Sequence, residues 1–180
     1  MDEEPRNQLP DEAAEAFSTI TVANDPPLVV LTTAAEGTLA GCLVGFHVQA
    51  GIEPQRYSLW ISKANHTYRT SLRAEHFAVH FLTADDVALA EQFGSRTGEE
   101  VDKFEGVATT LDEYGVPVLT GCPHRMLLDR LAVLDDGSDH VCLTATVRAA
   151  VSAGEYRPLR VSDVSHLDPG HGNEERAVEP

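Results

Sequence analysis

Two long apolar-rich runs in the second half of the chain constrain its fold most strongly. They span about 124–134 and 140–151, and the intervening residues 135–139 are Asp-Asp-Gly-Ser-Asp. Two β-prone runs that flank a short turn containing Asp-Gly are typical of a β-hairpin. We therefore predict two long antiparallel strands, which any fold of this chain must place side by side.

Shorter β-rich runs precede this hairpin, and few helical segments separate them. Strands are predicted at 28–33, 38–48, 57–61 and 76–82. Short helices are predicted at 11–20, at 67–73 and after a Thr83-x-x-Asp86 capping signal, ending at Gly94. Because the strands do not alternate regularly with long helices, a doubly wound parallel sheet is not favoured. The pattern predicts a mostly β, antiparallel barrel of at least six strands with a few peripheral helices.

Length and charge limit the class of protein. The 180 residues suit one domain, predicted at 11–169 between two loose polar tails at 1–10 and 170–180. The 29 acidic residues outnumber the 13 Lys and Arg residues, which gives a formal net charge of -16. Such a surface repels phosphate backbones and anionic lipids, so we expect neither a nucleic-acid-binding nor a membrane-binding protein. Without a secretory signal pattern or a long apolar run, a cytoplasmic location is expected.

The segment 62–67 carries the most concentrated set of polar side chains. Its hydroxyl, ammonium, amide and imidazole groups belong to Ser62, Lys63, Asn65, His66 and Thr67. The segment follows a predicted strand and precedes a predicted helix, whose first N–H groups lack intrahelical partners and carry partial positive charge. These features predict an anion site, most commonly for a phosphate. The structural alternative is a helix cap from Asn65 or Thr67 and a solvated Lys63.

A second unusual segment, 41–46, places two glycines inside a predicted strand. Gly41 and Gly45 weaken a strand unless the backbone bulges there or a ligand approaches it closely. A flat aromatic ligand lying against exposed backbone would explain both glycines. A bulge at a corner of the barrel is the alternative.

Several kinds of site have no support in the sequence. The eight histidines are scattered, and the three cysteines form no Cys-x-x-Cys pair, so no metal site is predicted. Cys42 and Cys122 are expected to be small buried apolar residues rather than nucleophiles. The sequence contains no Gly-x-Ser-x-Gly elbow, Walker loop or Gly-x-Gly-x-x-Gly fingerprint, which removes the main support for a serine hydrolase, a P-loop protein or a Rossmann enzyme.

From about Leu28 to His171 the order of these pieces resembles the flavin reductase-like family, the FMN-binding split barrels. The matching segments are 28–33, 36–46, 51–54, 62–67, 77–82, 103–104, 121–122 and 138–140, the last at the family's Gly-Asp-His. The chain departs from the family where Leu43, Gly45 and Phe46 replace a Thr and two Ser residues. Gly51 likewise replaces a Ser, and His80 replaces an Asn.

The resemblance implies an antiparallel split β-barrel flavoprotein that forms a homodimer. The expected reaction is hydride transfer from NAD(P)H to the flavin N5, with FMN as the cofactor and FAD or a deazaflavin as alternatives. Reduced flavin would then pass to a partner monooxygenase or another acceptor. Two further alternatives remain open, namely a non-catalytic flavin-binding module for storage or sensing, and a split-barrel oxidoreductase that uses another cofactor or acts on a small organic substrate.

The resemblance also implies roles for individual residues. The phosphate would be held by Ser62, Lys63, Asn65, His66 and Thr67. Backbone groups of Val44, Gly45 and Phe46 would face the flavin ring. His140 would lie beside the nicotinamide, although a polar residue that only closes the hairpin is the alternative.

Overall fold

Strands dominate the fold. They are β1 (Val29–Ala35), β2 (Thr38–Val44), β3 (His47–Ile52), β4 (Gln55–Ser62), β5 (His76–Phe81), β6 (Thr109–Leu111), β7 (Pro117–Leu119), β8 (His124–Leu134) and β9 (His140–Ser152). The helices are α1 (Asp11–Asn24), α2 (His66–Ser71), α3 (Val87–Gly94) and the 3-10 helix η1 (Val161–Val164). This computed structural model describes residues 9–96, 98 and 101–168. The predicted tails 1–10 and 170–180 lie outside these residues, apart from Leu9 and Pro10.

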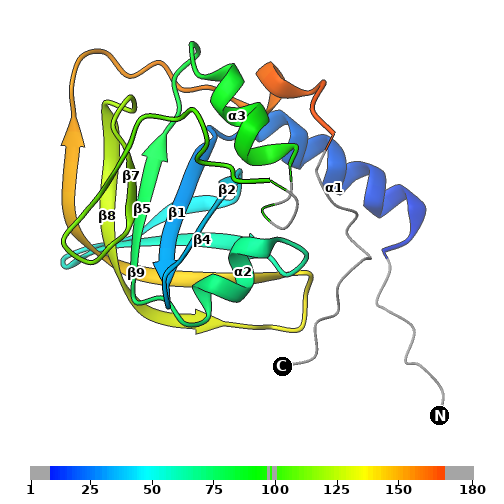
Figure 1. The fold of residues 1–180 in the computed structure, drawn as a ribbon. Coiled ribbons are helices and arrows are strands. Elements are labelled where there is room, and N and C mark those ends of the chain that lie inside the picture. The colour runs from blue at the N-terminus through cyan, green and yellow to red at the C-terminus, as the bar shows by residue number, and fades with distance from the viewer. Residues whose placement is uncertain (1–8, 97, 99–100, 169–180) are drawn as a thin grey trace.

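Within the described residues, seven strands form one antiparallel sheet in the order β2-β1-β5-β8-β9-β4-β3, and β6 pairs with β7 separately (Figure 1). The predicted antiparallel barrel with peripheral helices is confirmed. The β8–β9 hairpin was predicted almost to the residue. Its turn contains Gly137 with a φ of 88°, a conformation that favours glycine. Register shifts at 127/128 and 130/132 mark irregular pairing, which bends strands and helps the sheet curl.

The curled sheet is split between its two ends. In the strand order β2 is at one end and β3 at the other, and β2 contacts β4 across the opening. The run 38–48 was predicted as one strand broken by Gly41 and Gly45, but the structure breaks it at Gly45 alone and forms two separate strands. The structure ends β2 at Val44 and begins β3 at His47, because the chain leaves β1 and crosses the opening through Gly45 and Phe46 to pair with β4.

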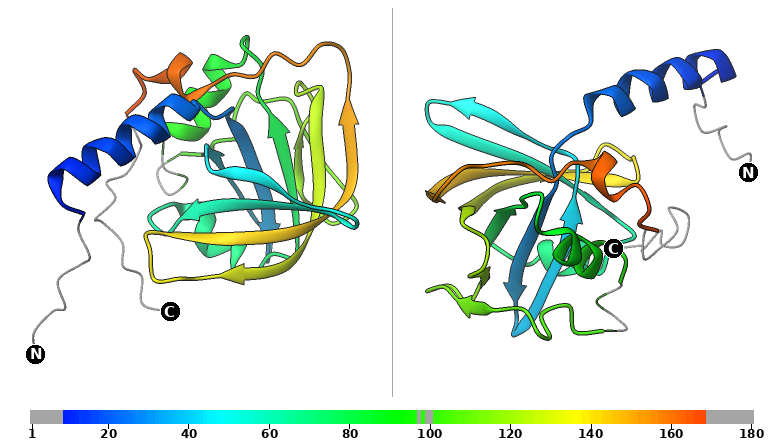
Figure 2. Two further views of the ribbon diagram at one scale, coloured as in Figure 1. Left: turned by 180° about the vertical axis from the view of Figure 1, so that it is seen from behind. Right: turned by 90° about the horizontal axis from the view of Figure 1, so that it is seen from above.

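The helices differ in how much they contact the barrel. No residue of α1 is buried, and the helix extends away from the strands, as Figures 1 and 2 show. Helix α2 contacts β1 and β2, and α3 contacts β2 and η1. The Thr83 N–H and hydroxyl both donate to Asp86. The predicted cap of the helix by Thr83 does not form, because α3 begins at Val87 and its N-cap residue Asp86 makes no side-chain capping hydrogen bond.

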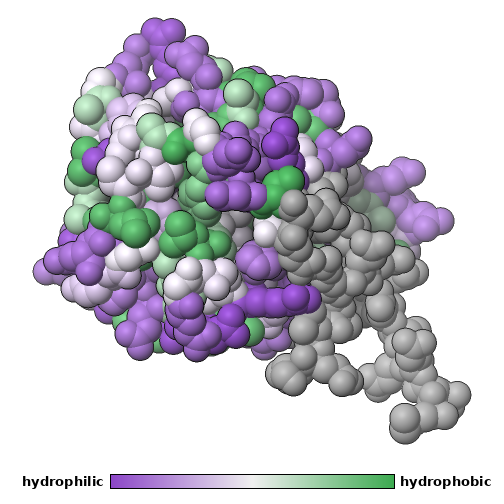
Figure 3. Space-filling model, in the orientation of Figure 1, coloured by the Kyte–Doolittle hydropathy of each residue, from purple (hydrophilic) through white to green (hydrophobic). Residues whose placement is uncertain are grey.

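The outer surface is mostly polar. Figure 3 shows polar residues over most of the face drawn in Figure 1, with apolar residues in smaller patches. One ion-pair cluster ties the turn between β6 and β7 to the long hairpin. In it Arg148 contacts the carboxylates of Asp112, Glu113 and Asp129 at 3.0, 2.9 and 3.1 Å.

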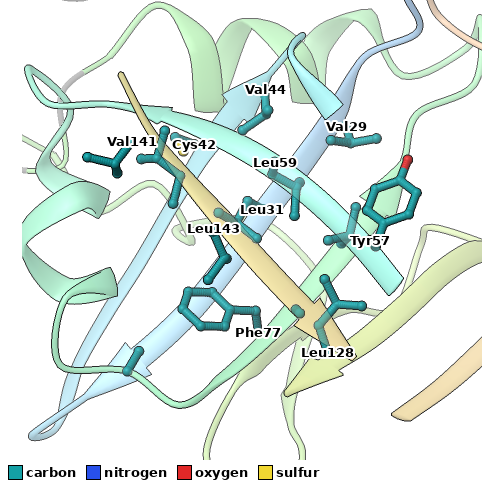
Figure 4. Packing of buried hydrophobic residues seen from close by; sticks show 14 of the residues in the cluster. Val29, Leu31, Cys42, Val44, Tyr57, Leu59, Phe77, Leu128, Val141 and Leu143 are labelled. Atoms are coloured by element: carbon teal, nitrogen blue, oxygen red, sulfur yellow. The ribbon is translucent and has the colours of Figure 1, made fainter. Parts of the chain in front are cut away.

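The main core lies inside the curled sheet (Figure 4). Each of its central strands contributes a fully buried side chain, namely Leu31, Leu59, Phe77, Leu128 and Leu143. A second cluster, which includes Leu28, Leu82 and Phe93, packs α3 and the C-terminal segment against the barrel. Burial of apolar surface stabilises the fold by about 25 cal/mol per Å². Residues of both clusters also line the opening, so their packing holds its walls in place.

His80 joins three strands through its imidazole. The side chain is fully buried, its Nε2 accepts the Leu119 N–H at 3.0 Å, and its Nδ1 therefore carries the proton donated to the Val30 carbonyl at 3.1 Å. Strands β5, β7 and β1 are thus linked by one neutral ring. Burial lowers the pKa of His80 to about 4, with Arg125 acting in the same direction.

Candidate functional site

A cavity of about 500 Å³ lies at the split of the barrel. It is bounded by the end of β2, the Gly45–Phe46 crossing, the end of β4, the end of α3 and the η1 segment. Most of its lining is aliphatic or aromatic, and the polar side chains are Ser62, Asn65, His140, Ser165 and Asp168. An apolar cavity of this size with a few polar groups is typical of a small-molecule site. Among the described residues that line it, none is Lys or Arg.

Two contacts hold one wall of this cavity in place. The buried Lys103 donates from its Nζ to the carbonyls of Phe93 at 2.9 Å and Gly41 at 3.3 Å, which ties α3 to β2. Burial lowers the pKa of Lys103. The approach of α3 also needs a glycine, because a Cβ at position 41 would lie 2.7 Å from the ring of Phe93.

The wall formed by η1 is anchored by Asp25. Its carboxylate accepts the Ser162 N–H at 2.9 Å and the Ser162 hydroxyl at 2.7 Å. These hydrogen bonds lower the pKa of Asp25. The segment that follows α1 and the segment near the C-terminus are therefore joined at the cavity, although they are far apart in the sequence.

The segment 62–67 begins at the cavity and is held by its own hydrogen bonds. Asn65 caps α2, since its Oδ1 accepts the Thr67 N–H at 3.0 Å, and Ser62 Oγ accepts the Ala64 N–H at 3.3 Å. The backbone N–H of Lys63 donates to the Asp139 carbonyl at 2.9 Å. The structure thus contains the predicted helix cap, while the side chains of Ser62 and Asn65 also line the cavity.

Three of the residues predicted to hold a phosphate lie outside this cavity. The Lys63 ammonium is 2.7 Å from Asp135 Oδ1 in the β8–β9 turn, and this contact lowers the pKa of Asp135. His66 faces a second cavity, of about 520 Å³, which Lys103 also lines. Thr67 is buried beside the Cys42 thiol, whose own pKa is raised by burial.

The other predicted residues meet in the first cavity. Val44, Gly45, Phe46 and His140 all line it, together with Ser62 and Asn65. His140 begins β9, and its Nδ1 is 2.9 Å from Asp139 Oδ1. Its imidazole lies 5.3 Å from the Phe46 ring, measured between centroids, with the planes inclined by 59°.

Sequence reasoning did not identify several other residues that line the cavity. Trp60, Phe93, Val161, Leu167 and Asp168 all line it. Trp60 could have been predicted as a site residue, because it is the single Trp of the chain and directly precedes Ile61 and Ser62. The η1 residues carried no such signal, since one turn of 3-10 helix is too short to show hydrophobic periodicity.

The cysteines are buried or partly buried, and none is paired in a disulfide. Cys42 and Cys122 are buried, as predicted, and burial raises the pKa of Cys122 to about 12. In the described part of the chain, no three His, Cys, Asp or Glu side chains gather in an arrangement that could hold a metal ion. No helix among these residues is both long and apolar enough to cross a membrane.

A curled antiparallel sheet, split on one side over an apolar cavity with polar edges, defines a split barrel with a candidate small-molecule site. The chain belongs to the flavin reductase-like domain family, whose model matches residues 23–163. It is 28% identical over 127 residues to the FMN reductase (NADH) SmoA of Agrobacterium fabrum, covering 71% of this chain and 70% of that protein.

Two further proteins show the same likeness. The reductase subunit HsaB of a flavin-dependent monooxygenase of Rhodococcus jostii is 26% identical over 132 residues, which cover 73% of this chain. The matched part spans 66% of HsaB, just under two thirds of its length. The crystal structure of an FMN-binding protein from Thermus thermophilus with bound p-hydroxybenzaldehyde superimposes with a TM-score of 0.65, at 26% identity and 71% coverage of each chain.

Proposed function

We propose that this protein is an NAD(P)H-dependent flavin reductase that binds FMN in the cavity at the split of the barrel. The observation that carries this proposal is the meeting of residues 44–46 with Ser62, Asn65 and His140 around one apolar space. When bound, the flavin would supply the hydride-accepting N5 atom. The chain's own contribution would be to bind, orient and shield the reactants.

The residues present fit a flat, largely apolar ring. Gly45 lies between β2 and β3, where the chain leaves one strand partner for the other. A Cβ there would lie 3.6 Å from its nearest neighbours, Leu28 and Val161, which is ordinary contact. Packing within the chain therefore does not require glycine at this position. Close approach of a ligand to the backbone would explain why a glycine is found there.

The polar residues would orient the ligand. The Ser62 hydroxyl and the Asn65 amide offer hydrogen bonds in the cavity, suited to the ribityl chain or phosphate of FMN. His140 would lie at the reacting side, beside the nicotinamide. The aliphatic lining would exclude water from the reacting atoms, which strengthens the electrostatic interactions between them.

The absorption spectrum of the purified protein after incubation with FMN tests this function. We expect flavin bands that remain after gel filtration and that bleach without oxygen when NADH or NADPH is added. Bound flavin that does not bleach would favour the storage or sensing module instead. Retention of FAD or a deazaflavin in preference to FMN would favour the alternative cofactors, and absence of any flavin binding would contradict the proposal.

We also propose a homodimer that delivers reduced flavin to a partner monooxygenase. The relative HsaB is the reductase subunit of a flavin-dependent monooxygenase. Strand β3 is an edge of the sheet, and two of its apolar side chains, Val48 and Ile52, are 50% and 81% exposed. An exposed apolar edge strand favours pairing with another chain.

Light scattering at micromolar concentration should give twice the 19.5 kDa mass of one chain, and a monomer mass would contradict the dimer.

A further inference from the structure

The mouth of the cavity carries a large aromatic side chain that the core does not use. Phe46 is 60% exposed, although it lines the cavity. Its backbone is fixed, because its carbonyl accepts the Trp60 N–H at 2.9 Å. Its ring contacts only the imidazole of His140 among the aromatic contacts of the described residues. A face of this ring is therefore available to a ligand that enters the cavity.

One carboxylate lies in the lining of this cavity, and a second contacts His140. Asp168 lines the same cavity, and Asp139 contacts the His140 imidazole at 2.9 Å. The lining contains no Lys or Arg among the described residues, and the neighbouring Lys63 is paired with Asp135. An aromatic face attracts a cation through its quadrupole, and a carboxylate attracts it through its charge. The mouth thus suits a positively charged planar ring better than a neutral one.

The proposed reaction produces such a ring. In that reaction NAD(P)H would give up a hydride, and this loss would convert the neutral dihydronicotinamide into a positively charged pyridinium. We propose that the Phe46 ring and the Asp168 carboxylate recognise this pyridinium, an assignment that rests on the proposed function. Positive charge develops on the nicotinamide as the hydride leaves, so the same groups stabilise the transition state more than the ground state.

Direct binding can test this recognition without flavin. Trp60 is the single Trp of the chain and lines the cavity, so its fluorescence reports occupancy. The probes are 1-methylnicotinamide, which carries the pyridinium charge, and nicotinamide, which is neutral. We expect the wild-type protein to bind the cation about three- to tenfold more tightly than the neutral ring. Phe46→Leu and Asp168→Asn should each remove most of that preference.

The control is Phe17→Leu. Phe17 is 61% exposed, like Phe46, but lies on α1, none of whose residues is buried. This variant should keep the full preference for the cation. Equal affinity of the wild-type protein for both probes, or an unchanged preference in Phe46→Leu, would overturn the assignment. A changed oligomeric mass in Phe46→Leu would also overturn it, by placing this ring in a subunit contact.

The kinetic consequence separates this inference from the proposed function. In Phe46→Leu, kcat for NADH oxidation should fall about three- to tenfold with a smaller change in KM, because the lost interaction forms mainly as charge develops. A wild-type protein that reduces flavin without preferring the cation would overturn this inference alone. A preference for the cation in a protein that binds no flavin would overturn both the reaction and the nicotinamide assignment.

Discussion

Acidification from about pH 7 to about pH 4 is expected to lower the free energy of unfolding by about 3 kcal/mol through His80 alone. The native fold needs the neutral ring, because Nε2 must accept the Leu119 N–H. A protonated ring would carry a hydrogen on that atom and lose the contact, leaving a charge in a fully buried position.

The sign follows from the two pKa values. Folding lowers the pKa of His80 from 6.5 to about 4, so the unfolded chain takes up the proton first as the pH falls. The contribution of neutral His80 to the free energy of unfolding is complete above the unfolded pKa of 6.5. It is lost as the pH falls from there to the folded pKa of about 4. His47 acts in the same direction, because burial also lowers its pKa.

Denaturant unfolding measured at several pH values checks this expectation. His80→Gln keeps one donor and one acceptor but does not titrate, so its stability should depend much less on pH in this range. If that variant does not fold, the NMR titration of the wild-type His80 imidazole gives the pKa directly. Stability that stays constant from about pH 7 to about pH 4, or a folded pKa near 6.5, would refute the argument.

Lys63→Ala is expected to weaken FMN binding roughly ten- to a hundredfold. A charge-assisted contact to a phosphate contributes on the order of 1.5–3 kcal/mol. The existing pair between Lys63 and Asp135 must be broken for this contact, but its side chains are 23% and 49% exposed. A pair in such a position contributes only about 0–1 kcal/mol, so the phosphate should displace the carboxylate.

Two controls make the result specific. Riboflavin lacks the phosphate and should bind the wild-type protein and Lys63→Ala nearly equally. Asp135→Asn releases Lys63 from its partner and should tighten FMN binding by up to about fivefold. Fluorescence quenching measures each of these affinities. Equal FMN dissociation constants for the wild-type protein and Lys63→Ala would show that Lys63 remains with Asp135 when flavin binds.

The sequence predicted features that depend on neighbouring residues better than features that depend on distant ones. The β8–β9 hairpin was predicted because its turn and its strands are adjacent in the chain. The break at Gly45 was expected, but the separate strand β3 after it was missed, because it depends on a strand partner, β4, that follows later. Strands β6 and β7 were missed because each contains three residues, too few for an alternating pattern.

The same distinction applies to the candidate site. Residues 44–46, Ser62, Asn65 and His140 were named from the sequence, and the structure brings them together around one cavity. Lys63, named with them, lies outside it. His66 and Thr67 were grouped with Ser62 because they are close in sequence. Successive helical residues, however, point about 100° apart, so at the start of α2 they face a second cavity and the interior. The η1 wall depends on Asp25, which lies far away in the chain.

The turn of the long hairpin has a consequence for protein engineering. Exposed hairpin tips usually tolerate insertions, affinity tags or new termini. Here the tip contacts the segment 62–67 twice, through the Asp135 carboxylate and the Asp139 carbonyl, and Asp139 also contacts His140. A peptide grafted between residues 135 and 139 would therefore disturb Ser62 and His140, which pair across β4 and β9 and both line the cavity. Natural variation in the length of this turn would be constrained for the same reason, despite its exposure to solvent.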